Sequence, residues 1–209
     1  MEPLARLASG DRTLVQILDT AMAEAARRSG SWLACRPGCT ECCIGPFPIT
    51  QLDALRLRTG LAELEAHDPE RAARVRERAW DYVARLGPQF PGDPDAGVLD
   101  ESEEGEERFA AYAEEEPCPA LDPATGTCDL YAARPVTCRL FGPAVRVGGE
   151  VLGVCELCYR GARDEEIVAC EVEPDPDGLE DALLDEAEET TGKRGQTIVA
   201  FALDQCDAA

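Results

Sequence analysis

The chain has 209 residues, of which 44% are hydrophobic and 5% aromatic, and this is enough apolar material for one packed domain. Its single histidine, His67, excludes metal sites built on two or three imidazoles, and no Gly-x-Ser-x-Gly motif indicates a serine hydrolase. The formal net charge of −22 argues against a nucleic-acid-binding surface.

Three helices are predicted in the N-terminal part, over residues 11–29, 50–60 and 69–86. In the first and third helices, apolar residues recur at three- and four-residue spacing, which is typical of an amphipathic helix. Thr50 and Asp53 form a variant of the capping box at the start of the second. Gly30 and Gly60 are expected to end the first two helices. Pro69, directly after an aspartate, favours a helix start there.

The remainder is expected to contain a linker over 87–105, a short helix over 106–115, a hairpin over 145–154, a helix over 178–191 and a strand over 197–203. The hairpin prediction depends on Gly148-Gly149, a typical two-residue turn. The sequence therefore predicts an α+β, mainly helical, single small domain with an irregular half organised by cysteines and metal, and a short β-hairpin. We expect the metal core over about 32–160, followed by an acidic helix and an apolar segment within 164–209.

Acidic residues are concentrated in the second half of the chain. Residues 1–90 hold 12 acidic and 12 basic side chains, whereas residues 91–209 hold 30 acidic and 8 basic ones. Two blocks, 93–116 and 164–189, carry most of this charge. Such blocks are usually solvated faces, and the alternative is a docking surface for a basic protein partner. No partner can be named, and neither nucleic acid nor membrane is expected as one.

Eleven cysteines are an unusual number for a chain without a visible export signal. The N-terminal residues lack the apolar stretch of a secretory signal, and no run of about 18 apolar residues predicts a membrane span. We therefore expect a cytoplasmic location. Thiols stay reduced there, so that clustered cysteines are expected to bind metal rather than to form disulfides.

The spacing of the cysteines predicts metal ligation. Four of them lie within nine residues, in the loop Cys35-Arg-Pro-Gly-Cys39-Thr-Glu-Cys42-Cys43, and such spacings allow one loop to wrap a single centre. A second group follows between 118 and 158. The nine candidate ligands are Cys35, Cys39, Cys42, Cys43, Cys118, Cys128, Cys138, Cys155 and Cys158. Cys170 and Cys206 stand apart and are predicted to be core thiols.

Two arginines flank one of these cysteines in Arg134-Pro-Val-Thr-Cys138-Arg139. The proline is expected to open a helical turn. Four thiolates around zinc, or around an oxidised cubane cluster, carry a charge of about −2, which cationic donors offset. Arg134 and Arg139 are therefore predicted to donate hydrogen bonds to metal-bound sulfur.

This pattern resembles the YkgJ-type cysteine-cluster family, the CxxCxxCC zinc- or iron-chelating domain, which includes flagellin lysine N-methylases. The matching stretches are the Cys35–Cys43 loop, Cys118-Pro-Ala-Leu, Gly126-Thr-Cys-Asp-Leu-Tyr and Arg134-Pro-Val-Thr-Cys-Arg-Leu-Phe, with Cys155 and Cys158 as the remaining family thiols. The resemblance covers about residues 32–160. It implies a bacterial cytoplasmic metal-binding domain and leaves zinc and iron open, while the methylases imply an iron–sulfur cluster and S-adenosylmethionine as cofactor.

Three functions remain as alternatives. The first is an iron–sulfur protein with a 4Fe-4S cluster, in which nine thiols suit one cluster plus a second site, or two clusters sharing the set. The second is a structural zinc protein that presents a surface to a partner. The third is an S-adenosylmethionine-dependent protein-lysine methyltransferase, for which no glycine-rich cofactor loop is visible. The spacing of Cys35, Cys39 and Cys42 is also that of radical S-adenosylmethionine enzymes, but Glu41 stands where those have an aromatic residue.

Overall fold

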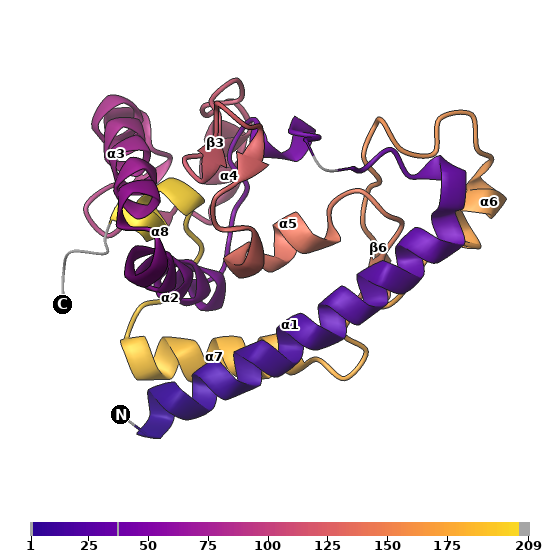
Figure 1. The fold of residues 1–209 in the computed structure, drawn as a ribbon, viewed down its shortest axis with the longest axis horizontal. Coiled ribbons are helices and arrows are strands. Elements are labelled where there is room, and N and C mark those ends of the chain that lie inside the picture. The colour runs from indigo at the N-terminus through magenta and orange to yellow at the C-terminus, as the bar shows by residue number, and fades with distance from the viewer. Residues whose placement is uncertain (1, 37, 205–209) are drawn as a thin grey trace. The chain divides into compact units, whose positions relative to one another are not determined.

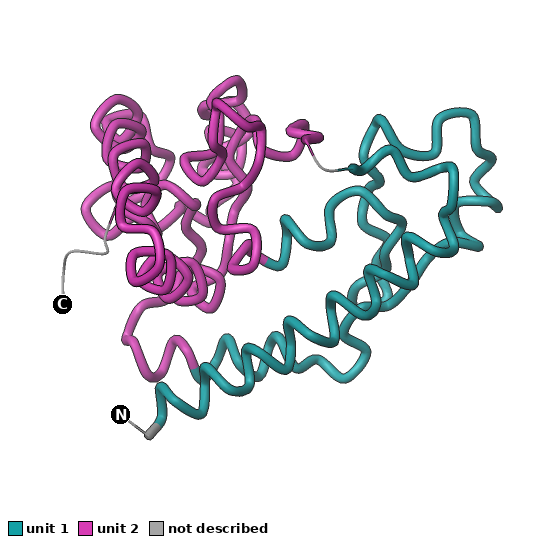
Figure 2. The backbone as a smooth tube through the Cα atoms, in the orientation of Figure 1, with its two compact units in different colours: residues 1–37, 136–186 teal, residues 38–135, 187–209 magenta. Residues whose placement is uncertain are grey.

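The computed structural model describes residues 2–36 and 38–204, and the chain in it forms two compact units (Figure 2). Unit 1 comprises residues 1–37 and 136–186, and unit 2 comprises residues 38–135 and 187–209. Each unit is therefore assembled from two stretches of sequence, and the predicted metal core contributes residues to both. Cys206 lies outside the described residues.

Unit 1 is built on one long helix. Its elements are α1 (Glu2–Ser29), the 3-10 turn η1 (Gly30–Trp32), α5 (Val136–Leu140), β5 (Arg146–Val147), β6 (Glu150–Val151), α6 (Asp164–Val168) and the first turns of α7 (Leu179–Thr191). Along α1, Leu7, Leu14, Leu18 and Ala25 are fully buried, and their spacing of four and seven residues puts them on one face. This face packs against α5.

The helix α1 begins nine residues earlier than the sequence indicated. Gly10 lies inside it, where a Cβ atom would stand only 2.6 Å from Leu183 Cδ2 of α7. Arg6 and Glu186 form a salt bridge of 2.7 Å between the same two helices. The absence of a side chain at Gly10 therefore allows α1 and α7 to pack closely.

Unit 2 has a core of three helices and several short elements. They are η2 (Glu41–Cys43), α2 (Gln51–His67), α3 (Pro69–Leu86), η3 (Gly87–Gln89), β1 (Gly92–Asp93), β2 (Val98–Leu99), α4 (Glu103–Ala110), β3 (Leu121–Asp122), β4 (Thr127–Cys128), η4 (Tyr131–Ala133) and α8 (Val199–Asp204). The helices α2, α3 and α8 pack against one another (Figure 1). The predicted capping box is confirmed, since Thr50 Oγ1 accepts from Asp53 N and Asp53 accepts from Thr50 N.

The predicted end of the second helix at Gly60 is wrong, because α2 continues to His67. A side chain at position 60 would collide with Ala133 Cβ of η4. Here again a glycine inside a helix allows a neighbouring segment to approach closely. The third helix is confirmed over 69–86, and Asp68 accepts from Arg71 N as its N-cap.

The predicted strand over 197–203 is also wrong. Thr197 does bridge to Ile49 in antiparallel fashion, but from Val199 the chain is helical. Four consecutive residues of α8, Ala200 to Leu203, are buried, so that the sequence shows no one-sided pattern. Within this helix Phe201 lies 4.3 Å from Phe90, ring centre to ring centre. A short apolar run buried on all sides cannot be assigned by periodicity.

The hairpin at Gly148-Gly149 is confirmed as β5–β6, and both glycines have positive φ angles of 58° and 86°. Two further two-stranded sheets, β1–β2 and β3–β4, occur in the described residues. The first lies in the stretch predicted as a linker, and its Leu99 N donates to Gln196 O. The helix predicted over 106–115 is α4, which begins earlier at its N-cap Ser102. The chain is thus α+β and mainly helical, as predicted.

Among the described residues, no helix has the length and apolar character needed to cross a membrane.

Candidate metal centre

In unit 2, two segments that are far apart in sequence are joined beside their cysteines. Cys118 N donates to Cys43 O at 2.7 Å, and Gly45 N donates to Glu116 O at 2.9 Å. Ile44 and Pro117 form a β-bridge between these two hydrogen bonds. This pairing brings the end of the first cysteine loop against the first cysteine of the second group.

A hairpin then brings the next cysteine to the same place. Leu121 N donates to Cys118 O at 2.9 Å, and Leu121 of β3 is directly opposite Cys128 of β4. Cys42 and Cys43 lie in η2, which Cys43 N closes by donating to Thr40 O. Four thiols of unit 2, on Cys42, Cys43, Cys118 and Cys128, are therefore gathered by two loops.

The four thiols strongly affect each other's ionisation. A hydrogen bond from Cys43 lowers the pKa of Cys42 to about 6, and the charge of Arg134 contributes to a smaller extent. The pKa of Cys43 is raised, mainly by its side-chain hydrogen bond to Cys42 and then by burial and the charges of the other thiols. Burial raises the pKa of Cys118 to about 12 and raises that of Cys128 as well. Binding of a metal cation to all four must therefore release protons.

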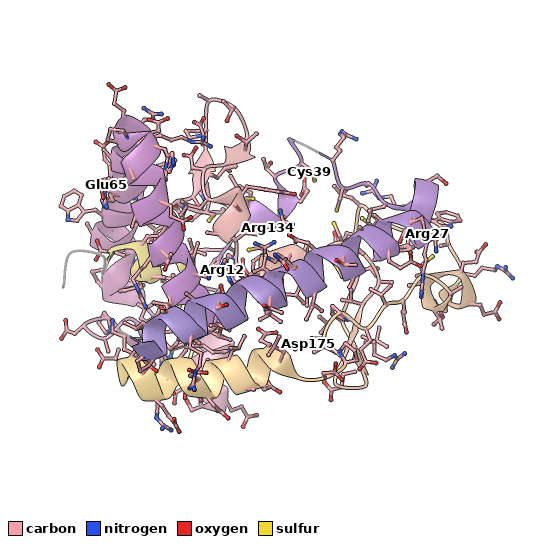
Figure 3. All side chains as sticks on the ribbon, turned by 60° about the horizontal axis from the view of Figure 1, so that its bottom comes forward. Arg12, Arg27, Cys39, Glu65, Arg134 and Asp175 are labelled. Atoms are coloured by element: carbon pink, nitrogen blue, oxygen red, sulfur yellow. The ribbon has the colours of Figure 1, made fainter. Side chains whose placement is uncertain are left out.

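Three arginines supply positive charge to this group. The charge of Arg134 helps to lower the pKa of Cys42 and offsets part of the rise in the pKa of Cys128. Its guanidinium lies 3.9 Å from the centre of the Tyr131 ring. Figure 3 labels Arg134 together with Cys39, the fifth described cysteine of unit 2. Burial raises the pKa of Cys118 and Cys128, and the charges of Arg78 and Arg71, respectively, offset a small part of that rise. Thiolates gathered at one place are thus partly neutralised before a metal binds.

The sequence analysis missed Arg71 and Arg78, which α3 places against the second cysteine group. Arg78 Nη2 donates to Asp129 Oδ2 at 2.6 Å, and its Nε donates to Pro119 O at 2.7 Å. Arg71 Nε also donates to Asp129, whose side chain is 3% exposed. Their spacing of seven residues is about two turns of an α-helix, so the sequence could have shown that both arginines lie on one face of α3.

Unit 1 holds a second group of five thiols, on Cys35, Cys138, Cys155, Cys158 and Cys170. Cys155 and Cys158 share one tight turn, in which Cys158 N donates to Cys155 O at 2.8 Å. Both are buried in an apolar cluster that also contains Cys170. Cys35 Sγ lies 3.9 Å from Cys158 Sγ.

Comparison with known families finds a match over the region that contains these cysteines. Residues 34–159 match the model of the family CxxCxxCC, described as "Putative zinc- or iron-chelating domain". The chain belongs to the CxxCxxCC family. Searches among curated proteins and among solved structures found no match. All nine predicted ligands lie within the matched region, and Cys170 and Cys206 lie outside it.

The CxxCxxCC motif itself is divided between the two units. Cys35 belongs to unit 1, and Cys39, Cys42 and Cys43 belong to unit 2. In the described parts of the chain, no three His, Cys, Asp or Glu side chains stand at the spacing of a ready-made metal site. The family description supports zinc or iron chelation, and the ligand set remains a prediction.

The two arginines predicted beside metal-bound sulfur are in different surroundings. Pro135 does precede a helical turn, α5, which contains Cys138 and Arg139 in unit 1. The buried Arg139 donates from Nη1 to Asp19 Oδ1 of α1 at 2.6 Å. Arg134 belongs to unit 2, where its charge helps to lower the pKa of Cys42. Hydrogen bonds from both arginines to metal-bound sulfur remain predictions.

Proposed function

We propose that this CxxCxxCC domain is an iron–sulfur protein whose cluster is held in unit 2. The proposed ligands are Cys42, Cys43, Cys118 and Cys128, with Cys39 of the same loop as a fifth available thiol. The observation that carries this proposal is the hydrogen bond from Cys118 N to Cys43 O, which joins two cysteine groups about 75 residues apart. These side chains fit a metal centre because all are thiols, the softest ligands that proteins offer.

The described cysteines of unit 2 are sufficient for a cluster. A 4Fe-4S cluster takes four cysteine ligands, and five described cysteines are available in this unit. Arg71, Arg78 and Arg134 offset the negative charge that four thiolates and bridging sulfides carry. When bound, a cluster supplies one-electron redox chemistry, and the chain's own residues hold the thiolates and set their protonation.

A cytoplasmic location forms part of the proposal. None of the ten described cysteines forms a disulfide, although the sulfurs of Cys35 and Cys158 lie only 3.9 Å apart. Such an arrangement suits a compartment in which glutathione and thioredoxin keep thiols reduced.

Anaerobic purification tests the proposed cluster. We expect a brown protein with iron and acid-labile sulfide, and with an absorption band in the near-ultraviolet to blue region that reduction bleaches. Cys118→Ser is expected to lose most of the iron, because it removes a ligand at the junction of the two segments. Cys206→Ser, outside the family match, serves as the control and should keep its iron. A colourless unsubstituted protein that holds zinc in unit 2 would contradict the cluster.

The role of Arg134 gives a pH prediction. Its charge lowers the pKa of Cys42 and Cys128, so Arg134→Gln raises both, and protons then compete with the metal at higher pH. On acidification we expect metal release to begin a fraction of a pH unit higher than in the unsubstituted chain. Arg134→Lys should largely restore the release pH because it keeps the charge.

Arg108→Gln is the matched control for that titration, because it removes an exposed arginine paired with Asp100. Its release curve should coincide with that of the unsubstituted protein. Coincident curves for Arg134→Gln as well would show that Arg134 has no influence on the thiolates.

A further inference from the structure

Two cysteines of unit 1 have their sulfur atoms close together. Cys35 Sγ and Cys158 Sγ are 3.9 Å apart, although 123 positions separate the two residues. Cys35 is exposed to solvent, whereas Cys158 is buried, with only 4% of its surface accessible. Neither residue is among the four ligands proposed above for the cluster, so the cluster does not account for their proximity.

The backbone beside Cys158 is held against the segment that leads to Cys35. Tyr159 N donates to Trp32 O at 2.8 Å, and the buried hydroxyl of Tyr159 is hydrogen-bonded to Ser29 Oγ at 2.5 Å. Tyr159 also has a positive φ angle of 55°, which is uncommon for a residue with a side chain. The turn that carries Cys158 is therefore fixed opposite the chain between Ser29 and Cys35.

There is space beside the Cys35 sulfur. A Cβ atom at Gly142 would stand 2.6 Å from Cys35 Sγ, so a larger residue there would displace the sulfur. Gly142 also has a φ angle of 119°, which residues with a side chain rarely adopt. Because Cys35 is exposed and position 142 carries no side chain, the Cys35 sulfur has room to turn toward Cys158.

An exposed thiol beside a buried one is the arrangement of a reversible thiol-oxidation site. Redox-sensing cysteines are accessible to solvent and often have a second, resolving cysteine next to them. An oxidant in solution can reach Cys35, and Cys158 can then react with the modified Cys35 sulfur inside the protein. In a reducing compartment, disulfides of this kind are transient rather than structural.

We propose that Cys35 and Cys158 are a modification site, at which a low-molecular-weight disulfide such as glutathione disulfide oxidises the pair to a reversible protein disulfide. The Cys35 thiolate attacks the S–S bond of the oxidant and expels one small thiol, which leaves a mixed disulfide on Cys35. Cys158 then loses its proton, attacks Cys35 Sγ and expels the second small thiol. The protein gives up two protons and two electrons, and the oxidant is reduced to two thiols. While this disulfide exists, neither sulfur can bind a metal as a thiolate.

The test is oxidation of the full reduced chain, purified anaerobically with its metal, in buffers with a rising ratio of glutathione disulfide to glutathione. After the remaining thiols are blocked, mass spectrometry of the digested protein should show Cys35 linked to Cys158 in most molecules at the highest ratio. Dithiothreitol should reverse the link. Cys35→Ser should not form it, and because Cys35 is exposed this variant should fold. Cys158→Ser should stop at the mixed disulfide and carry one glutathionyl group on Cys35.

Two neighbouring cysteines provide matched controls. Cys155 and Cys170 are buried in the same apolar cluster as Cys158, and the Cys155→Ser and Cys170→Ser variants should still form the link. A disulfide between Cys155 and Cys158 instead, or a pair that stays reduced at the highest ratio, would overturn the modification site. Iron measured in the same samples separates the two proposals. If iron is absent but Cys35 and Cys158 become linked, the cluster fails and the modification site stands.

Discussion

Removal of the metal is expected to lower the free energy of unfolding of residues 117–135 by on the order of 10 kcal/mol, the scale of structural metal sites in small domains. This segment has little else to hold it. Its regular elements are two strands of two residues each and the turn η4, and its buried apolar residues are Ala120, Leu121 and Leu130. By contrast α2 buries residues between Gln51 and Leu61, and α3 buries residues between Ala72 and Tyr82. The segment should therefore unfold first.

Hydrogen exchange of the metal-free protein measures this effect. Amides of residues 117–135 should exchange many times faster after chelation, while those of α2 and α3 change much less. Amide protection in 117–135 that is the same with and without metal would mean that the arginines and the hairpin suffice to fold it.

Asp129→Asn is expected to destabilise unit 2 by about 3 kcal/mol, the lower end of the cost of breaking a buried ion pair. The carboxylate is 3% exposed and accepts from both Arg71 and Arg78, which lie seven residues apart on α3. Removing its charge leaves two cations facing an amide. The two arginines remain partly exposed to water, which limits the cost.

Urea denaturation of the metal-loaded protein measures the loss of stability caused by Asp129→Asn. The control is a substitution in a second salt bridge made by an arginine of α3. Glu65→Gln breaks the more exposed salt bridge between Glu65 and Arg76 and should cost less than about 1 kcal/mol. Equal costs for the two substitutions would show that Asp129 is not an anchor between α3 and the cysteine hairpin. Because Asp129 follows Cys128 directly, its loss should also weaken metal retention.

Helix positions were predictable where local chemistry decides them. The pairs Thr50 with Asp53, and Asp68 with Pro69, marked helix starts that the structure confirms. Glycine misled the prediction at Gly60, which was expected to end a helix, and Gly10 lies inside a helix that was expected to begin after it. Both lie at close approaches between elements, and only the tertiary partner reveals such a role.

The sequence predicted which residues are candidate ligands, but not which of the cysteines lie together in the structure. Spacing identified nine thiols within the region that the family matches. It could not show that Cys35 and Cys39, four residues apart, belong to different compact units. The role of the α3 arginines was likewise not predictable, because Arg71 and Arg78 come near the cysteine hairpin only through the tertiary packing of α3, as in the hydrogen bond from Arg78 to Pro119 O.

The order of the chain also affects how the protein is made. Unit 2 needs α8, whose residues Ala200 to Leu203 complete its core, and unit 1 needs the stretch 136–186. Neither unit can finish folding until most of the polypeptide has left the ribosome, because synthesis runs from the N-terminus. The loop from Cys35 to Cys43 emerges long before the cysteines that it meets. The four thiols of this loop must therefore stay reduced, without forming disulfides, during most of the chain's synthesis. Metal insertion must follow once the later cysteines have been made.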